Sequence, residues 1–182
     1  MAALRRLMMQ RYWLGIGANI GNPEEQMSLS ISYLNSHLDV TVESVAPLYR
    51  TPPWGKTDQP HFLNSALSVS SSLVPLELLD FCKSVEMRLD RRPGERWGPR
   101  PIDLDIIAWG GGGFVSDRLE LPHPRAAERG FVLVPLVDIA PDLELDGATV
   151  AELAARADCA GISMAEPTGW HQSDGNRGGD QL

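Results

Sequence analysis

The chain is organised around one stretch, Arg96-Trp97-Gly98-Pro99-Arg100-Pro101-Ile102-Asp103-Leu104-Asp105-Ile106-Ile107. Its second half alternates apolar residues with Asp103 and Asp105, and this period of two predicts a β-strand with one buried face. Both aspartates then leave the same face, with Cα atoms roughly 6.6 Å apart. Two carboxylates at that spacing can bind a divalent cation, and their hard oxygen atoms favour Mg²⁺.

The alternative interpretation is that Asp103 and Asp105 form the solvated face of an edge strand. However, the same face continues with Ile107 and Trp109, which is unlike a purely solvated face. Arginines also concentrate just before the strand, at Arg88, Arg91, Arg92, Arg96 and Arg100. Carboxylates beside a cluster of arginines indicate a site for a nucleoside triphosphate with Mg²⁺.

A second candidate binding surface lies on the predicted strand from Phe62 to Val69. Phe62 and Asn64 leave one face of it, while Leu63 and Leu67 leave the other. An aromatic ring and an amide suit a flat heterocycle, through stacking and paired hydrogen bonds. The alternative is an ordinary pair of strand residues beside a turn.

The run from Arg96 to Ile107 resembles the signature of the 6-hydroxymethyl-7,8-dihydropterin pyrophosphokinase family, and further matches extend from about Tyr12 to Leu145. The resemblance implies an enzyme of folate biosynthesis that transfers diphosphate from ATP to the pterin alcohol. It also implies that the attack falls on the β-phosphorus and releases AMP. ATP would be the co-substrate, and two Mg²⁺ ions would be bound by Asp103 and Asp105.

The resemblance also implies three groups of site residues. The catalytic group is Arg91, Arg92, Arg100, Asp103 and Asp105, where Arg91 and Arg92 are alternatives because this loop is one residue shorter than in some relatives. The pterin group is Thr51, Pro52, Pro53, Trp54, Gly55, Phe62, Asn64, Trp97 and Phe131. The ATP group is Glu86, Arg96, Arg100, Arg118, His123 and Arg129. No side chain is assigned as a general base.

Two glycine-containing segments resemble nucleotide-binding motifs but fail on spacing. The run Gly15 to Gly21 places its last glycine one residue late for a dinucleotide-binding fingerprint, so we expect these glycines to let a strand end turn sharply. The run Gly55-Lys56-Thr57 has Arg50 where a P-loop needs glycine, and Pro52-Pro53 lack N–H groups. Neither segment predicts a phosphate-binding loop.

Strands and helices are expected in the order β-α-β-β-α-β, which predicts a ferredoxin-like α/β sandwich. Its central sheet would be mainly antiparallel, with an additional hairpin at 110–113 and short helices. The expected strands and helix starts are 12–18, Pro23 after an Asn22 cap, 40–49, 62–69 and Pro75. We expect residues 1–10 to be an extension, 11–159 a single pyrophosphokinase domain and 160–182 a disordered tail.

Composition narrows the functional class. The chain has 182 residues with 16 basic and 24 acidic side chains, a net charge of −8, which argues against a nucleic-acid partner. No apolar run is long enough for a membrane, and two distant cysteines do not suggest a disulfide framework. We therefore expect a cytoplasmic monomer that binds small molecules. The alternatives to the transferase are a Mg²⁺-dependent nucleotide hydrolase and a non-catalytic pterin- or nucleotide-binding module.

Overall fold

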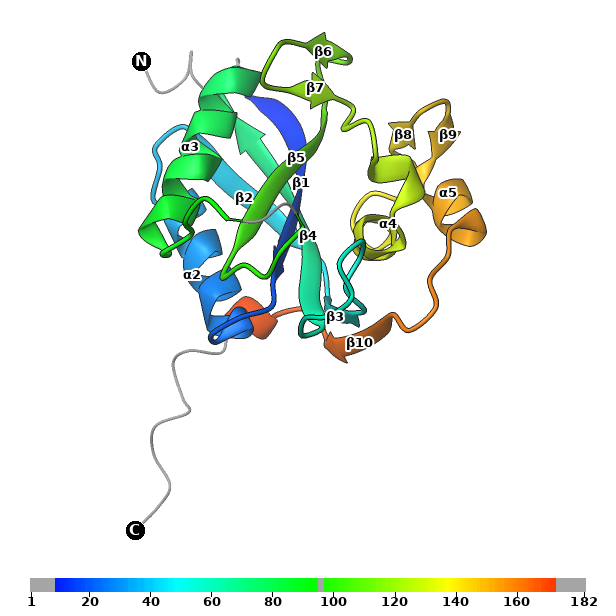
Figure 1. The fold of residues 1–182 in the computed structure, drawn as a ribbon. Coiled ribbons are helices and arrows are strands. Elements are labelled where there is room, and N and C mark those ends of the chain that lie inside the picture. The colour runs from blue at the N-terminus through cyan, green and yellow to red at the C-terminus, as the bar shows by residue number, and fades with distance from the viewer. Residues whose placement is uncertain (1–8, 95–96, 173–182) are drawn as a thin grey trace.

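The computed structural model describes residues 9–94 and 97–172 (Figure 1). Its elements, in chain order, are β1 (Gln10–Ala18), α2 (Pro23–Asn35), β2 (Val40–Val45), β3 (Leu48–Thr51), β4 (Phe62–Ser71), α3 (Pro75–Arg88), β5 (Asp103–Trp109), β6 (Phe114–Val115), β7 (Glu120–Leu121), η1 (Ala126–Glu128), α4 (Gly130–Val137), β8 (Glu144–Leu145), β9 (Ala148–Thr149), α5 (Val150–Arg156), β10 (Ser163–Glu166) and η2 (Trp170–Gln172).

The central sheet has the strand order β10-β3-β4-β1-β5, and β2 also pairs with β4. Its strand pairings are antiparallel throughout the described residues. The expected order of strands and helices is present, with the strand expected at 40–49 divided in two, and short helices follow. The additional hairpin is β6–β7, but its turn lies at 116–119, whereas the glycines at 110–113, where the turn was expected, connect β5 to β6. The predicted α/β sandwich with a mainly antiparallel sheet is therefore confirmed.

Helices cover both faces of the sheet (Figure 1). Helices α2 and α3 pack on one face, where the apolar stripe Leu78, Cys82 and Val85 joins the larger core cluster. Helix α4 packs on the opposite face against a second cluster that includes Ile107 of β5. The alternation of β5 therefore sends Leu104 into the first core and turns Asp103, Asp105 and Ile107 toward α4.

Local signals set the starts of both large helices. The Asn22 side chain accepts a hydrogen bond from the Glu25 N–H group at 3.5 Å, and Pro23 is the first residue of α2, as predicted. Helix α3 likewise has a proline, Pro75, as its first residue. Proline fits these positions because the first N–H groups of a helix have no partner inside it.

The strand expected at 40–49 is interrupted. It forms β2 and β3, with Ala46 and Pro47 between them, because proline has no N–H group for the ladder. The Ala46 carbonyl instead accepts hydrogen bonds from the Ser65 hydroxyl and from the Trp170 indole N–H, both at 2.9 Å. This break therefore provides an attachment point for a distant part of the chain.

The expectation of a disordered tail from residue 160 is wrong for residues 160–172. Strand β10 pairs antiparallel with β3, and Trp170 is 5 % exposed within the larger core cluster. Trp170 and the pairing of β10 with β3 hold this segment in place. Its sequence therefore needs no hydrophobic period. Residues 1–8 and 173–182 lie outside the described residues, and Gln10 of the expected extension already belongs to β1.

Cys82 is buried in the core, and Cys82 and Cys159 are both free cysteines. Among the described residues, no helix has the length and apolar character needed to cross a membrane.

Candidate active site

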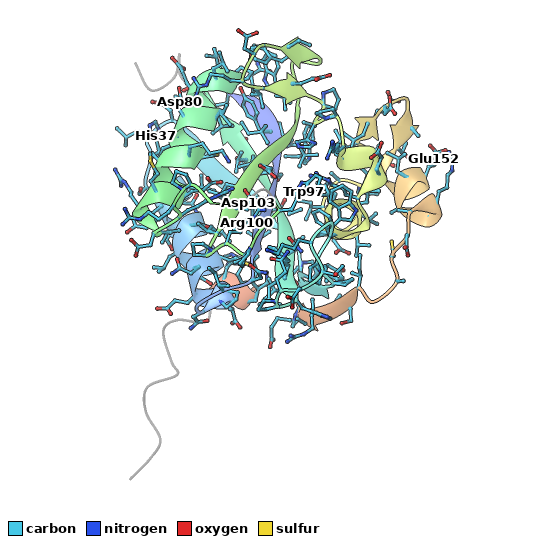
Figure 2. All side chains as sticks on the ribbon, viewed as in Figure 1. His37, Asp80, Trp97, Arg100, Asp103 and Glu152 are labelled. Carbon is cyan, nitrogen blue, oxygen red and sulfur yellow. The ribbon has the colours of Figure 1, made fainter. Side chains whose placement is uncertain are left out.

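A cavity of about 250 Å³ opens between the sheet face that carries Asp103 and the start of α4. Figure 2 shows Trp97, Arg100 and Asp103 together in this central region, while Asp80 and Glu152 lie at the periphery. The cavity brings together most of the predicted site residues, namely Thr51, Pro52, Trp54, Phe62, Asn64, Arg91, Trp97, Arg100, Asp103, Asp105, His123, Arg129 and Phe131.

The remaining predicted residues do not line this cavity. Glu86 is only 3 % exposed, and its carboxylate is directed at strand β5. Arg118 lies at the surface, where it pairs with Asp80 of α3. Pro53, Gly55 and Arg92 are also absent from the lining, and Arg96 lies outside the described residues.

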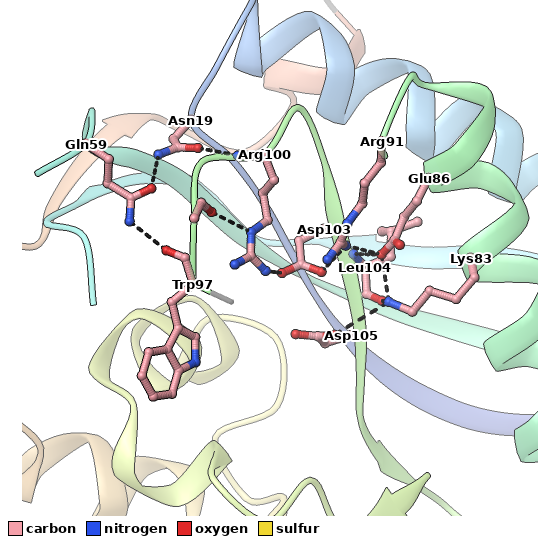
Figure 3. A network of polar contacts seen from close by, with 11 residues as sticks. Asn19, Gln59, Lys83, Glu86, Arg91, Trp97, Arg100, Asp103, Leu104 and Asp105 are labelled. Atoms are coloured by element: carbon pink, nitrogen blue, oxygen red, sulfur yellow. Dashed lines mark hydrogen bonds and ion pairs between the residues drawn. The ribbon is translucent and has the colours of Figure 1, made fainter. Parts of the chain in front are cut away.

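The two aspartates form the acidic part of the cavity (Figure 3). Asp103 lies opposite Gly17 of β1 and Asp105 opposite Gly15, so both carboxylates leave the strand beside residues without side chains. Each oxygen of Asp103 accepts a hydrogen bond from one guanidinium group, Oδ1 from Arg91 and Oδ2 from Arg100. The carboxylate of Asp105 is 43 % exposed.

The environments of the two carboxylates shift their pKa values in opposite directions. Burial would raise the pKa of Asp103, but the charges of Arg91 and Arg100 outweigh it and hold that pKa below its ordinary value. The pKa of Asp105 is raised, first by loss of hydration and then by the Asp103 charge. Water reaches Asp105, yet protein surrounds it in a concave site, so its hydration is incomplete.

This donor set fits a metal ion that takes most of its ligands from a substrate. Two neighbouring carboxylates repel each other, and a divalent cation between them would relieve that repulsion. Within residues 9–94 and 97–172, no group of three or more His, Cys, Asp or Glu side chains could hold a metal. Mg²⁺ suits such a site because it keeps several waters or phosphate oxygens as ligands.

The end of α3 distinguishes Arg91 from Arg92. Asp90 adopts a left-handed φ of 62°, and the N–H groups of Asp90 and Arg91 bond back to the carbonyls of Met87 and Glu86. This turn directs the Arg91 side chain to Glu86, at 2.7 Å, and to Asp103. Arg92 points away, with its side chain 84 % exposed.

Aromatic rings and an arginine cover the other end of the cavity. The rings of Trp54 and Trp97 meet edge to face, with centroids 5.6 Å apart. The Arg129 guanidinium lies 5.0 Å from the Trp54 ring and 5.6 Å from the Phe131 ring. A flat ligand would therefore meet aromatic surface next to a positive charge.

Gly55 supports this cover although it does not line the cavity. A Cβ atom at Gly55 would lie 3.1 Å from the Trp97 ring, and its φ of 82° also favours glycine. Trp97 itself has a φ of 60°, which bulky residues rarely adopt. The tryptophan ring can thus lie close to the backbone of the proline-rich loop only because residue 55 has no side chain.

A polar pair lies on the floor of the aromatic part of the cavity. The Asn64 amide donates to the Thr51 hydroxyl at 2.7 Å, and both residues are buried. Phe62 lines the cavity with them, while Leu63 packs toward the core, as the strand alternation predicted. The amide oxygen of Asn64 packs against Gly17, where a Cβ atom would approach it to 2.3 Å.

Gly15 and Gly17 therefore differ from their expected role. They lie within β1, and the left-handed residue after the strand is Gly21, with a φ of 72°. Close packing against Asn64, rather than a turn, requires glycine at position 17. No local pattern reveals this requirement, because Asn64 lies on another strand.

We expect Gly17→Ala to weaken binding of a heterocyclic ligand about tenfold, because the added methyl group must displace the Asn64 amide. Gly15→Ala should weaken this binding less, since its methyl group would meet the Ile107 side chain at 3.5 Å, an ordinary contact distance. Calorimetric titration with 6-hydroxymethyl-7,8-dihydropterin, the ligand that the family resemblance implies, measures both affinities. Equal affinities for Gly17→Ala and the parent chain would show that the Asn64 position is unimportant.

His123 is held in one protonation state. Its Nδ1 atom accepts a hydrogen bond from the Arg125 N–H group at 3.1 Å, which leaves the proton of a neutral ring on Nε2. Burial lowers the pKa of His123; the Asp105 charge opposes this change, and the Arg129 charge reinforces it. At neutral pH the imidazole is therefore uncharged and can donate from Nε2.

Local sequence patterns did not predict a set of hydrogen bonds from Asn19 and Gln59 that joins three loops, and we call this set the bracket (Figure 3). The Asn19 side chain accepts from the Arg100 N–H group at 2.8 Å and donates to Gln59 at 3.0 Å. Gln59 in turn donates to the Trp97 carbonyl at 2.8 Å. The bracket ties the end of β1 to the loops that carry Trp54 and Arg100, and only a comparison of distant loops could have identified it.

A family model described as 7,8-dihydro-6-hydroxymethylpterin-pyrophosphokinase (HPPK) matches residues 13–141. A protein of Methylorubrum extorquens named 2-amino-4-hydroxy-6-hydroxymethyldihydropteridine pyrophosphokinase is 44% identical over 158 residues, covering 87% of this chain and 100% of the relative. A protein of the same name from Pseudomonas aeruginosa is 38% identical over 156 residues, covering 85% of this chain and 96% of the relative.

Among solved structures, wild-type Plasmodium falciparum HPPK-DHPS with STZ-DHP matches with a TM-score of 0.65 and 14% identity. The match covers 81% of this chain and 43% of that chain, and at this identity it supports the fold alone. The sequence matches are much stronger, and they span most of this chain together with nearly the whole length of both bacterial relatives. The chain belongs to the 7,8-dihydro-6-hydroxymethylpterin-pyrophosphokinase family.

Proposed function

We propose that this protein transfers diphosphate from ATP to 6-hydroxymethyl-7,8-dihydropterin in folate biosynthesis. The observation that carries the proposal is a single cavity with two chemically distinct ends. One end holds Asp103 and Asp105 with two arginines, and the other holds aromatic rings beside the Asn64 amide. Family membership supports the same reaction.

In this proposal the pterin occupies the aromatic end. Phe62, Phe131 and Trp97 would contact its flat faces, and Trp54 would complete the cover. Asn64 and Thr51, which already bond to each other, would present an amide and a hydroxyl to the polar edge of the pterin. Because this pocket is already formed, little entropy is lost in ordering its side chains when a rigid ligand binds.

The triphosphate occupies the charged end. Arg91 and Arg100 would neutralise the transferring group and the departing AMP, which is the usual contribution of arginines to phosphoryl transfer. His123, through Nε2, and Arg129, which extends from the aromatic end, both line the cavity and would contact phosphate oxygens. Arg92 and Arg118 have no comparable position, because both are largely exposed.

Asp103 and Asp105 would hold Mg²⁺, and we propose two ions. When bound, the metal supplies positive charge that polarises the phosphates. Both oxygens of Asp103 are paired with arginines in this structure, so binding would exchange partners. Asp103 and Asp105 would then hold the metal, and Arg91 and Arg100 would hold the phosphates. Each charged group would keep a partner of opposite charge.

The proposed reaction conserves atoms and charge in a simple way. A bond forms between the pterin hydroxyl oxygen and the β-phosphorus, and the bond from that phosphorus to the oxygen shared with the α-phosphate breaks. AMP leaves with the electron pair of that bond, and the hydroxyl proton is released. The cavity would exclude water and align the two substrates, which by itself accelerates a two-substrate reaction.

Product analysis tests the proposal. The protein is incubated with ATP, MgCl₂ and 6-hydroxymethyl-7,8-dihydropterin, and nucleotides are separated by anion-exchange chromatography. We expect AMP and pterin diphosphate in equal amounts, and no AMP without the pterin. Nucleotide release without the pterin would indicate a hydrolase, and no turnover at all would indicate a binding module.

The metal assignment has its own test. We expect Asp105→Asn to lower turnover by about 10² or more at limiting Mg²⁺, since developing phosphate charge loses its neutralisation. The melting temperature should not fall, because this substitution removes one of two neighbouring like charges. Near-normal turnover at limiting Mg²⁺ would show that Asp105 does not bind the metal.

We also propose that the enzyme is a cytoplasmic monomer without nucleic-acid or membrane partners. The net charge of −8 supports this view, because a general nucleic-acid binder would need an excess of basic residues. Sedimentation velocity at several protein concentrations tests the monomer.

A further inference from the structure

Two side chains of α3 bind both backbone polar groups of Leu104, the residue between the two aspartates (Figure 3). The Leu104 N–H group donates to Oε1 of Glu86 at 2.7 Å. The Leu104 carbonyl accepts from Nζ of Lys83 at 3.2 Å, and Lys83 also donates to Glu86 at 2.8 Å. We call this arrangement the Lys83–Glu86 clasp.

The clasp takes the place of a missing neighbouring strand. Strand β5 ends the central sheet and pairs only with β1 among the described residues, with Leu104 opposite Ile16. The outward N–H and C=O groups of an edge strand need other partners. Lys83 and Glu86 are three positions apart on α3 and so reach the same stretch of strand.

Charge makes the clasp stronger than an ordinary side-chain contact. Glu86 is 3 % exposed, and its Oε1 atom also forms an ion pair with the Arg91 guanidinium at 2.7 Å. The ammonium group of Lys83 donates both to the Glu86 carboxylate and to the Leu104 carbonyl, so one cation serves both parts of the clasp. Hydrogen bonds to charged groups are stronger than those between neutral groups.

The position of Leu104 controls both carboxylates. Asp103 and Asp105 are its immediate neighbours, and their side chains leave the strand on the face opposite to that of Leu104. Nζ of Lys83 also lies 3.9 Å from Oδ1 of Asp105, the closest cation to that carboxylate among the described ion pairs. A shift of the strand at Leu104 would therefore change the spacing of the aspartates.

We propose that Lys83 and Glu86 are positioning residues, which fix β5 so that Asp103 and Asp105 keep the spacing a divalent cation needs. This inference rests on the proposed role of the aspartates in metal binding. Neither residue lines the cavity, so both act through the strand and not by contact with substrate.

Amide hydrogen exchange without any ligand tests the clasp itself. In Glu86→Ala we expect the Leu104 amide to exchange about tenfold faster or more, the effect of losing a hydrogen bond to a charged group. The Leu14 and Ile16 amides on β1 report whether the sheet remains folded. Unchanged Leu104 protection in a folded variant would overturn the clasp, and Glu86→Met, which keeps the length of the side chain but has no oxygen acceptor, provides the same readout if Glu86→Ala does not fold.

Mg²⁺ dependence of nucleotide binding tests the positioning role. Calorimetry with the non-transferable analogue α,β-methylene ATP gives the Mg²⁺ concentration for half-maximal binding. We expect Lys83→Met to raise this concentration about tenfold, as when a partner of a metal ligand is removed. Lys83→Arg should restore most of it, because arginine keeps the charge and the donors.

The sign of this change separates positioning from simple repulsion. If Lys83 only competed with the metal for Asp105, Lys83→Met would lower the required Mg²⁺ concentration, and that result would overturn the inference. Arg88→Met is the matched control, since it removes one charge from the same helix at an exposed position beside Tyr33. It should leave the Mg²⁺ dependence unchanged.

Asp105→Asn separates failure of this inference from failure of the metal assignment. A changed Mg²⁺ dependence in Asp105→Asn without a change in Lys83→Met would refute the positioning role of Lys83 and leave the metal assignment intact. No change in either variant would refute the metal assignment, whereas the ligand-free exchange experiment would still judge the clasp.

Discussion

Arg91→Ala should lower turnover by about 10³, because this guanidinium would neutralise charge that develops on the transferring phosphoryl group. Its position supports a large effect: the side chain is 25 % exposed, bonds to Asp103 and lines the cavity. Single-turnover measurements with saturating ATP, Mg²⁺ and pterin give the rate of the chemical step. The loss should appear mainly in that rate and less in nucleotide affinity.

Arg92→Ala is the matched control for Arg91→Ala. The two residues are adjacent and carry the same charge, but Arg92 is 84 % exposed and lies 3.9 Å from its nearest acidic partner, Asp90. Exposed pairs of this kind contribute little, so turnover should stay within about twofold. Comparable losses in both variants would mean that overall charge, and not the position of Arg91, determines the rate.

Truncation after Ala160 should lower the melting temperature by about 10 °C or more, because it removes Trp170 from the core and β10 from the sheet edge. Replacing a buried tryptophan by alanine alone costs about 3–5 kcal/mol, and each kcal/mol lowers the melting temperature of a chain this size by about 2–4 °C. The indole N–H bond to Ala46 is lost as well. Thermal unfolding followed by circular dichroism measures the change.

The same truncation should weaken pterin binding. Strand β10 pairs with β3 just before Thr51, and Gly161 lies against Pro52 of the predicted pterin loop. Trp170→Ala separates the anchor from the strand, and Met164→Ala, at a side chain 56 % exposed, is the control. A melting temperature unchanged in Trp170→Ala would show that the Trp170 anchor contributes nothing to stability.

Local sequence patterns determined most of the central fold. The period of two in β5, the Asn22 cap and the stripe Leu78, Cys82 and Val85 each depend on residues a few positions apart. Such patterns can be recognised because neighbouring side chains must share a face or satisfy the same helix end. They placed Asp103 and Asp105 on one face, while the names of their substrates came from family resemblance.

Contacts between distant segments were beyond those patterns. The tail from residue 160 has a polar, glycine-containing sequence. Nevertheless, the Trp170 indole N–H donates to the Ala46 carbonyl, in the break between β2 and β3. Glu86, which was expected at the nucleotide, accepts a hydrogen bond from Leu104, a contact that no local pattern indicates. Lys83, Asn19 and Gln59 carry no motif, because their partners lie in other loops and strands.

The amino-acid sequence by itself determined the antiparallel sandwich, the carboxylate pair and the aromatic strand, since these follow from local periodicity and residue chemistry. Only the tertiary structure placed Arg91 in the cavity and Arg92 outside it, because the left-handed residue Asp90 precedes them and their adjacent side chains point in different directions. It also decided that Gly17 must lack a side chain and that α3 holds the edge of β5. Those features depend on distances between segments, which no short stretch of sequence encodes.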